Sequence, residues 1–549
     1  MIFDAEKTSG RIKNSAATIA AGINALSDRT VFLWITVSYF TWRILSLPMF
    51  ETSGDAAWKW RFLRYFYATG VWFPTTPEHH QGRWAQNIPV YWLMKLFDSS
   101  APWIGAIVPV LSGFAVLFLI WKIARQFTTR ASALAAVIIT AGNPVFINES
   151  AQLLPSMGST MYILLTLYLF ICYIKSPEKW FLPLAAGVTM GLAWGCKVTS
   201  VYWALGIGIF LLIHQTGGKN IMTFKKIRIG WDALLFATGF LLIFIPETLI
   251  INHCFDLTLG RVDLLGGHHG NNPRLVQFNL VEYIFAPLVI FLNISGKFIR
   301  SGVMASLFLL AIVPAVIKIR SKNISLAEKF LLFVMFSALI CHCYMVVKVF
   351  PFKHPERPLV RYFLALYCVW SVIIVSFRHC LFEIGGKKMR SLISAAYKSV
   401  FFILCILLAV NFVNDPIIKK HNIFTKIRAY RCMAIHKTQN TPVLVRFEHG
   451  KKFRTKTFKI ITAWESFFGD LKKLPEFQKP NMEIIKNEYM ARVPYEDSKG
   501  NLYFHLWGKK INNGTVDNCI IIDDDFVQYR KIHLSEKKNH AITYKSKTL

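Results

Sequence analysis

Apolar residues in this chain gather into long runs, which short polar or basic segments separate. A helix that crosses the hydrocarbon core of a bilayer needs about 20 largely apolar residues. The pattern therefore predicts an all-α polytopic membrane domain with about eleven transmembrane helices, and twelve or thirteen as alternatives. The predicted spans are Thr30–Phe50, Ala101–Ile123, Ala131–Ile147, Gly158–Ile174, Trp180–Cys196, Thr199–Ile213, Trp231–Ile251, Gly302–Ile319, Phe330–Val347, Tyr362–Phe377 and Val400–Phe412.

One apolar run is too short for a crossing. Tyr283–Leu292 is flanked by Glu282 and Lys297. We predict a re-entrant or interfacial segment there, with a twelfth span as the alternative.

Basic residues set the expected orientation. With eleven spans, every second loop is rich in Lys and Arg, and the positive-inside rule puts those loops in the cytoplasm. Residues 1–29 are basic and have no early apolar core, so they are predicted to be a cytoplasmic tail and not a cleaved signal peptide. The segments expected to face outward are Glu51–Ser100, Asn148–Met157, Asn252–Gly302 and Lys348–Arg361, together with the tail after Phe412.

The predicted transmembrane domain covers residues 30–412, and residues 413–549 are predicted to be an outward-facing domain. This tail is polar and has aromatic residues for a small core. Alternation in Lys456–Thr462 and Cys519–Ile522 predicts strands, so a small soluble α/β or β-rich domain is expected. Cys432 and Cys519 both fall in it, and the sequence leaves open whether they form a disulfide.

Composition agrees with a membrane protein. Hydrophobic residues make up 54% of the chain and charged residues only 17%, less charge than a soluble domain carries. The formal net charge is +32, which in a soluble protein would suggest a nucleic-acid partner. Here the basic inner loops and attraction to anionic membrane lipids account for it, so no nucleic acid is expected.

Asp55 is the first candidate for chemistry, because it is an acidic residue a few positions beyond the first predicted span. The next segment, Ala56–Gly70, has aromatic residues at helical spacing with cations between them, which predicts an amphipathic helix in the membrane interface. Its aromatic residues are Trp58, Phe62, Tyr65 and Phe66, and its cations are Lys59, Arg61 and Arg64.

A polar turn farther along the same segment carries His79, His80 and Arg83. These side chains could bind substrate phosphate or a divalent metal ion. Adjacent histidines rarely bind one ion together, and structural hydrogen bonding or membrane anchoring would use the same residues. The sequence therefore leaves metal dependence open, and no cofactor is assigned.

The segment before the tenth span is dense in charge, with Lys348, His354, Glu356, Arg357 and Arg361. Guanidinium groups bind phosphate in a bidentate manner, so this segment is a candidate lipid-phosphate site on the outer face. The alternative is that these cations reach toward lipid headgroups.

Lys197 lies between two apolar runs, at the predicted outer end of both. An ionisable residue near the membrane indicates function. The alternative is again that the side chain only extends to the membrane interface, where its charge is hydrated. The Gly-rich segment Arg261–Arg274 could be a mobile loop over a substrate cleft or an ordinary flexible loop.

In order and position these motifs resemble the GT-C superfamily of polytopic glycosyltransferases. The nearest likeness is to the branch that contains protein O-mannosyltransferases and the bacterial aminoarabinose transferase of lipid A. It covers roughly residues 30–377. The matching motifs are Gly54-Asp55-Ala56, His79-His80, Gly191 to Lys197, and His354 to Arg361. Protein mannosyltransferases usually have Glu after the aspartate, where this chain has Ala56.

The resemblance implies an inverting transferase with a polyprenyl-phosphate-sugar donor. The acceptor would be lipopolysaccharide or another glycolipid, a glycan or a protein, on the periplasmic face of a bacterial inner membrane. Asp55 would be the catalytic base. The expected donor-phosphate ligands are Lys197, Lys348, Arg357 and Arg361, and the expected substrate-binding residues are His79, His80, Arg83, His354 and Glu356.

Two alternatives stay open. An O-antigen ligase or polymerase also combines many spans with outward arginines and a histidine, but would not need Asp55. A flippase or transporter of lipid-linked sugars is the alternative without catalysis. It would favour internal repeats and charges within spans, whereas we detect no repeat in this sequence.

Overall fold

The structure is a computed structural model. The residues that it describes are 15, 17–46, 56, 59, 62–63, 66–67, 70, 81–98, 102–214, 221–224, 227–255, 257–258, 260–263, 275–277, 298–321, 323–344, 353–355, 360–383, 387–414, 442–448, 456–462, 491–496, 502–506, 516–522, 527–532, 536–537 and 541–544. The chain divides into two compact units. Unit 1 comprises Met1–Trp42, Ser112–Ile147 and Ser156–Val413, and unit 2 comprises Arg43–Leu111, Asn148–Pro155 and Asn414–Leu549.

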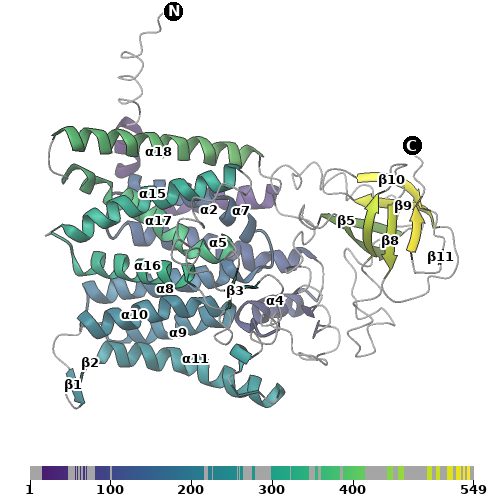
Figure 1. Cartoon of the computed structure of the whole chain (residues 1–549), viewed down its shortest axis with the longest axis horizontal. Coiled ribbons are helices and arrows are strands. Elements are labelled where there is room, and N and C mark those ends of the chain that lie inside the picture. Colours follow the sequence, from purple (N-terminus) through teal and green to yellow (C-terminus); the bar gives the residue numbers. More distant parts are fainter. Residues whose placement is uncertain are drawn as a thin grey trace, which may run out of the picture. The chain divides into compact units, whose positions relative to one another are not determined.

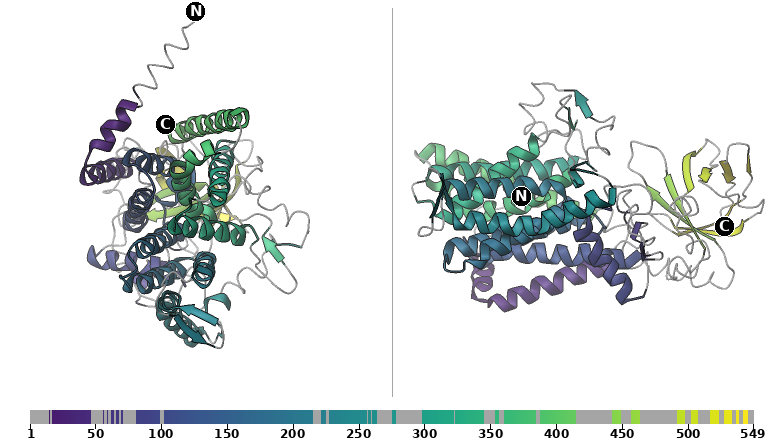
Figure 2. Two further views of the ribbon diagram at one scale, coloured as in Figure 1. Left: turned by 90° about the vertical axis from the view of Figure 1, so that its left-hand side faces the viewer. Right: turned by 90° about the horizontal axis from the view of Figure 1, so that it is seen from below.

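Unit 1 is built from helices that run side by side (Figures 1 and 2). The α-helices that lie wholly or mostly in it are α2 (Asp28–Ser46), α5 (Pro102–Ala124), α6 (Arg130–Ala141), α7 (Pro144–Glu149), α8 (Pro155–Lys175), α9 (Phe181–Cys196), α10 (Val201–His214), α11 (Trp231–Phe255), α15 (Phe298–Arg320), α16 (Leu326–Cys343), α17 (Leu364–Phe377) and α18 (Lys387–Asn414). The 3₁₀ helices are η1 (Val198–Ser200), η2 (Val360–Phe363) and η3 (Arg378–Glu383). Two short strand pairs lie in the segments between helices. Strand β1 (Ile221–Phe224) pairs with β2 (Ile227–Gly230), and β3 (Leu275–Gln277) pairs with β4 (Lys353–Pro355).

A described helix overlaps each of the eleven predicted spans. Among the described helices, seven are long and apolar enough to cross a membrane by themselves, and three shorter apolar ones accompany them. The chain is thus mostly helical and multi-pass, as predicted. The count of eleven crossings stays a prediction, and the short run Tyr283–Leu292 lies outside the described residues.

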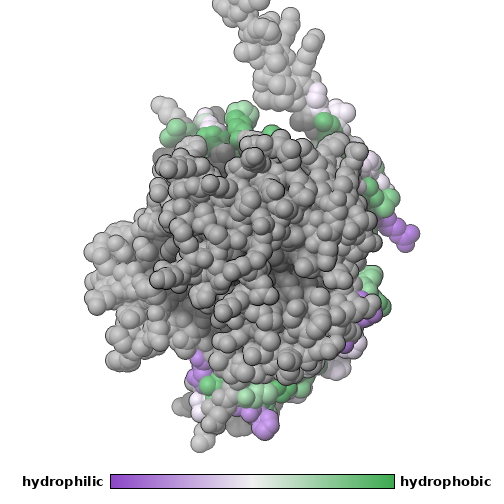
Figure 3. Space-filling view, turned by 90° about the vertical axis from the view of Figure 1, so that its right-hand side faces the viewer, coloured by the Kyte–Doolittle hydropathy of each residue, from purple (hydrophilic) through white to green (hydrophobic). Residues whose placement is uncertain are grey.

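The surface of unit 1 fits a lipid environment. Helix α17 is buried along its whole length, whereas α11 leaves Leu242 58% and Leu249 62% exposed, and α18 leaves Phe402 66% exposed. Hydrophobic side chains form much of the described surface that Figure 3 shows. Apolar side chains gathered in this way would be costly in water, and they indicate the faces that contact lipid.

The tightest helix pair in unit 1 is α9 with α11, where glycines let the backbones touch. A Cβ atom on Gly187 would lie 2.1 Å from the carbonyl oxygen of Phe236, and one on Gly239 would lie 2.2 Å from that of Leu184. A Cβ atom on Gly191, one turn farther along α9, would lie 2.6 Å from the side chain of Ile243. Small residues are what allow such close packing between membrane helices.

Basic residues at the predicted cytoplasmic end of unit 1 meet the few acids there. Arg130 Nε lies 2.6 Å from Asp28 Oδ1, and Arg125 Nε lies 3.9 Å from it. The hydrogen bond from Arg130 holds the pKa of the Asp28 carboxyl below its usual value. Lys318 Nζ lies 3.1 Å from Glu328 Oε1, in the first turn of α16.

Two predicted boundaries were wrong for local reasons. The third span was expected to continue to Ile147, but α6 ends at Ala141. Pro144 cannot continue a helix that needs its backbone N–H, and the Asn143 side chain accepts from Val145 N to begin α7. Helix α18 begins at Lys387, well before the predicted Val400, because basic residues extend the helix beyond its apolar run.

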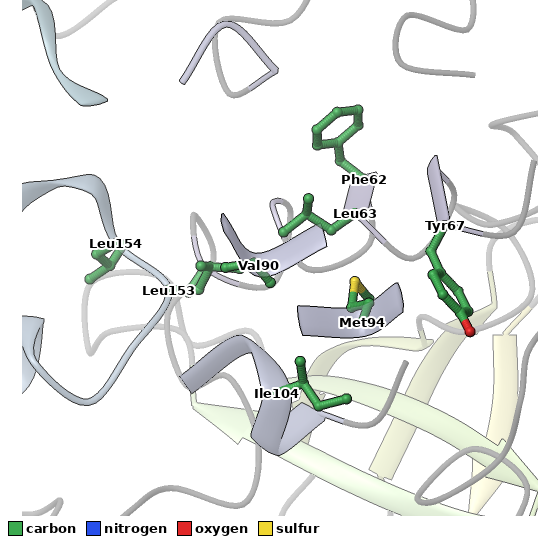
Figure 4. Close-up of a cluster of buried hydrophobic side chains, with 9 residues drawn as sticks. Phe62, Leu63, Tyr67, Val90, Met94, Ile104, Leu153 and Leu154 are labelled. Atoms are coloured by element: carbon green, nitrogen blue, oxygen red, sulfur yellow. The ribbon is translucent and has the colours of Figure 1, made fainter. Parts of the chain in front are cut away.

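Unit 2 has a small apolar core of its own (Figure 4). At its described positions up to Tyr67, the predicted amphipathic segment Ala56–Gly70 is helical, and it buries Phe62, Leu63 and Tyr67. These side chains pack with Val90 of α4 (Trp84–Leu96). The remaining buried members of the cluster are Ala56, Met94, Ile104, Leu153 and Leu154. The segment therefore packs on protein through this face.

The described strands of the C-terminal tail form one sheet, in the order β10-β9-β5-β6-β7-β8-β12-β11. They are β5 (Pro442–Glu448), β6 (Lys456–Thr462), β7 (Ala491–Glu496), β8 (Leu502–Leu506), β9 (Val516–Ile522), β10 (Val527–Ile532), β11 (Glu536–Lys537) and β12 (Ala541–Tyr544). Both segments whose alternation predicted strands lie in them, in β6 and β9. The tail as a separate domain stays a prediction, and the question whether Cys432 and Cys519 pair concerns side chains outside those that the structure describes.

The glycine contact yields a stability prediction. Gly239→Ala should force α9 and α11 apart and destabilise the protein by about 1–3 kcal/mol, the usual cost of overpacking. Gly208→Ala in α10 is the matched control, because a Cβ there meets nothing within 4 Å. Thermal unfolding in detergent should show a lower Tm for Gly239→Ala alone. Equal Tm values for both variants would contradict the close contact.

Candidate functional site

The predicted site residues fall into three groups. Lys197, Arg361 and Arg83 are described with their side chains, and His354 is described only as a backbone position in β4. Arg83 immediately precedes α4 at its N-terminus. The predicted site residues that lie outside the described residues are Asp55, His79, His80, Lys348, Glu356 and Arg357.

Lys197 lies at a break between two helices. Helix α9 ends at Cys196, and the extended backbone of Lys197 (φ −156°, ψ 124°) separates it from η1 and α10. Its side chain turns toward the start of α8, where Nζ donates a hydrogen bond to Ser156 Oγ at 3.0 Å. The same ammonium lies 4.0 Å from the centroid of the Tyr362 ring, within cation–π range.

The contact with Tyr362 brings a second predicted site residue to this end of unit 1. Arg361 precedes Tyr362 in η2 and is partly exposed. His342, near the end of α16, has its ring centroid 5.6 Å from that of Phe363, the next residue of η2. Lys197 therefore lies against η2, the short helix that carries Arg361, although the two residues are far apart in the sequence.

Backbone pairing joins two of the segments predicted to face outward. Strand β3 pairs antiparallel with β4, and in this register Val276 lies opposite His354. The first strand belongs to the predicted outer segment Asn252–Gly302 and the second to Lys348–Arg361. Their pairing agrees with both segments lying on one side of the membrane.

A buried ion pair lies beside the Lys197 turn. Arg261 Nη2 is 2.7 Å from Glu247 Oε1, and both side chains are only 3% exposed. Arg261 also donates to the backbone carbonyl of Trp194, and the Trp194 indole Nε1 donates to Glu247 Oε1 at 3.2 Å. Burial lowers the pKa of the Arg261 guanidinium, and Glu247 acts against this shift.

Unit 2 contains a second buried polar group. Arg43 donates a hydrogen bond to the Ser150 hydroxyl, and both residues are buried. Beside Ser150, Glu149 is only 1% exposed. One of its carboxylate oxygens, Oε1, accepts from Asn148 Nδ2 at 3.2 Å. The other, Oε2, has no hydrogen-bond partner within the described part of the chain.

Two side chains hold the segment that follows this group. Lys59 is fully buried and donates to the carbonyl oxygen of Leu153 at 3.1 Å. Gln86 of α4 donates to the carbonyl oxygen of Leu154 at 2.9 Å. The expectation that Lys59 lies on the polar face of an interfacial helix was wrong, because a backbone carbonyl inside the protein binds its ammonium.

The residues predicted from the sequence to form the site do not include Arg43, Glu149, Glu247 or Arg261. Arg43 and Glu247 lie inside predicted spans, where an ionisable side chain is by itself a sign of function. Glu149 lies in the short predicted outer segment Asn148–Met157. An ionisable side chain inside a span can be recognised from the sequence, whereas the pairing of Glu247 with Arg261 can be seen only in the structure.

Among the residues that the structure describes, no three His, Cys, Asp or Glu side chains gather as metal ligands. His79, His80 and Asp55 lie outside the described residues.

The chain resembles known membrane glycosyltransferases. Residues 88–249 match the family described as "Dolichyl-phosphate-mannose-protein mannosyltransferase". This match bears out the predicted resemblance to the GT-C branch that contains the protein O-mannosyltransferases. The matched part includes Glu149, Lys197 and Glu247. A comparison with curated protein sequences finds no match.

Solved structures of other proteins are similar to part of this chain. One is ArnT from Cupriavidus metallidurans bound to undecaprenyl phosphate, with a TM-score of 0.44, 14% identity, and coverage of 70% of this chain and 72% of that one. Another is the Archaeoglobus fulgidus oligosaccharyltransferase in the apo form, with a TM-score of 0.41, 13% identity, and coverage of 71% and 55%. The oligosaccharyltransferase AglB from Archaeoglobus fulgidus, in complex with an inhibitory peptide and a dolichol-phosphate, has a TM-score of 0.40, 13% identity, and coverage of 70% and 56%.

The buried carboxylate of Glu149 gives a prediction about stability. Burying an ionisable carboxylate costs more than burying an amide of the same shape, so Glu149→Gln should raise the Tm by about 2 °C. Exposed Glu178 supplies the control, since Glu178→Gln should leave the Tm unchanged. A lower Tm for Glu149→Gln would mean that the carboxylate stabilises the fold.

Proposed function

We propose that this protein is an inverting glycosyltransferase. It would move a sugar from a polyprenyl-phosphate-sugar donor to an envelope acceptor on the outer face of a bacterial inner membrane. The acceptor would be a lipopolysaccharide or other glycolipid, a glycan or a protein. The observation that carries the proposal is the meeting of Lys197, Ser156 and Tyr362 beside Arg361, at one end of the helices of unit 1.

This group has the chemistry of a phosphate site. Lys197 supplies a compact positive charge, and Arg361 supplies a guanidinium whose geometry fits phosphate oxygens. Ser156 lies in the first turn of α8, where free backbone N–H groups and the helix dipole favour an anion. The sugar-linked phosphate would replace part of the hydration of these groups and receive their hydrogen bonds.

The proposed reaction needs one base and a stabilised leaving group. The acceptor oxygen attacks the anomeric carbon while the bond between that carbon and the phosphate oxygen breaks. Asp55 takes the acceptor proton, and the departing polyprenyl phosphate keeps the bonding electrons. Lys197 and Arg361 stabilise the charge on that phosphate, together with Lys348 and Arg357.

The remaining predicted residues are proposed to bind the sugar and the acceptor. They are His79, His80, Arg83, His354 and Glu356. Polar side chains near the reacting sugar orient it and thereby lower the entropic barrier to transfer. Sensitivity of the purified enzyme to a chelator would show whether a divalent metal takes part.

The general base gives the first test of the function. Asp55→Asn should lower sugar transfer by purified protein at least 100-fold, the usual scale for loss of general-base catalysis. Asp98→Asn is the control, because asparagine can still accept the hydrogen bond that Tyr67 donates to Asp98 and tolerates the positive φ of 42° at this position. The assay measures turnover of a polyprenyl-phosphate-sugar.

The same assay separates the alternatives. Retained transfer by normally expressed Asp55→Asn would contradict this mechanism and favour a ligase or polymerase that does not need the aspartate. A wild-type protein that moves lipid-linked sugars across vesicles without consuming them would be a transporter.

The donor site gives a second test. Arg361→Ala should weaken binding of polyprenyl phosphate by about 10- to 100-fold, the scale of one or two charge-assisted hydrogen bonds. Arg357→Ala should act in the same direction, and acceptor specificity should change less than donor binding. Arg320→Ala controls for charge, because Arg320 is an exposed cation at the predicted cytoplasmic end of α15. An unchanged donor Kd in both site variants would rule out this role.

A further inference from the structure

The Lys197 turn is held from one side by the buried ion pair between Glu247 of α11 and Arg261, which follows that helix. Trp194 is the residue through which this happens. Its indole donates to Glu247, and its backbone carbonyl accepts from Arg261, which itself pairs with Glu247. Both ends of Trp194, side chain and main chain, are therefore fixed to one carboxylate and one guanidinium.

This fixed residue lies just before the turn that carries the candidate phosphate ligand. The backbone N–H of Lys197 donates to the carbonyl of Ala193 at 2.9 Å, which closes the last turn of α9 around Trp194. A shift of Trp194 would therefore move the point at which α9 ends. The Lys197 side chain would then no longer be oriented so that its ammonium reaches Ser156 and Tyr362.

Packing alone does not require a charged pair here. The glycines Gly187 and Gly239 already bring α9 and α11 into backbone contact, and apolar side chains of similar size would fill the same space. A buried ion pair is a weak source of stability, because each charge gives up its hydration. The ion pair instead fixes the orientation of these groups, because Arg261 donates to a carboxylate and to a backbone carbonyl at the same time.

We propose that Glu247 and Arg261 are positioning residues that set the Lys197 turn for the donor phosphate. The inference rests on the proposed role of Lys197, which it deepens. Neither residue needs to touch the substrate, because they act through Trp194. The Gly-rich segment that begins at Arg261 is thereby tied at its first residue to the candidate phosphate site.

A double-mutant cycle tests the coupling. Binding of undecaprenyl phosphate would be measured for wild type, Glu247→Gln, Lys197→Met and the double variant, each purified in detergent. Glu247→Gln should weaken binding about tenfold, because small misplacements of a binding group have large effects. In the Lys197→Met background the same substitution should cause no further loss.

A matched control is available in the ion pair between α15 and α16. Glu328 pairs with Lys318 at 3.1 Å, and it lies 14 positions before His342 on α16, about 20 Å along the helix. Glu328→Gln removes a comparable ion pair and should leave the donor Kd unchanged.

Arg261→Lys keeps the positive charge but removes the planar set of N–H donors of the guanidinium. It should therefore weaken donor binding less than Glu247→Gln does, and it should preserve the Tm.

A second readout does not depend on the donor. Mass spectrometry would follow modification of Lys197 by an amine-reactive reagent, with exposed Lys179 as the internal reference. Lys197 should react several-fold faster in Glu247→Gln, because its ammonium is released from Ser156 and Tyr362. Lys179 should react at the same rate in both proteins.

The outcomes separate the inference from the function on which it rests. Glu247→Gln could weaken donor binding as much in the Lys197→Met background as in the wild-type background. That result would overturn the inference, because the effect of Glu247 on binding would then not depend on Lys197. Unchanged labelling of Lys197 in Glu247→Gln would also overturn it. Unchanged donor binding in Lys197→Met, with faster labelling of Lys197 in Glu247→Gln, would instead contradict the phosphate role and leave the positioning intact.

Discussion

The backbone contact between α9 and α11 is the constraint on which the candidate donor site depends. Only glycine at Gly187 and Gly239 permits it, because any Cβ atom would overlap a carbonyl oxygen of the facing helix. This approach brings Glu247 within reach of the Trp194 indole. The end of α9, and with it the direction of Lys197, follows from how closely these two helices pack.

Polar contacts specify the helix packing elsewhere in unit 1. Lipid is as apolar as the helix surfaces, so burial of leucine against leucine gives little preference for one arrangement. Hydrogen bonds do give a preference, as between Thr166 of α8 and Thr189 of α9, whose hydroxyls lie 2.8 Å apart. The ammonium of Lys197, which links α8 to the turn after α9, belongs to the same class of contact.

The sequence predicted the helices well where apolar runs end at charged or proline residues. Helix α5 differs from the predicted span by one residue at each end, and α9 by one residue at its start. Prediction failed at α18, because a basic stretch can be helical without being apolar, and at α6, where apolar residues continue past a proline. Lys197 was recognised because an isolated charge between apolar runs is visible in the sequence itself. Its partners Ser156 and Tyr362 were not, because neither residue type is unusual at its position.

The sequence alone determined that this is a helical membrane protein, and it determined which side chains are out of place in such a protein. Hydropathy and charge are properties of each residue, so they can be read locally. The tertiary structure alone decided which of these side chains meet. Lys197 lies beside Tyr362, Arg261 pairs with Glu247 and Lys59 turns inward to Leu153. Such contacts join residues distant along the chain, and they depend on helix approach and rotation that no single segment encodes.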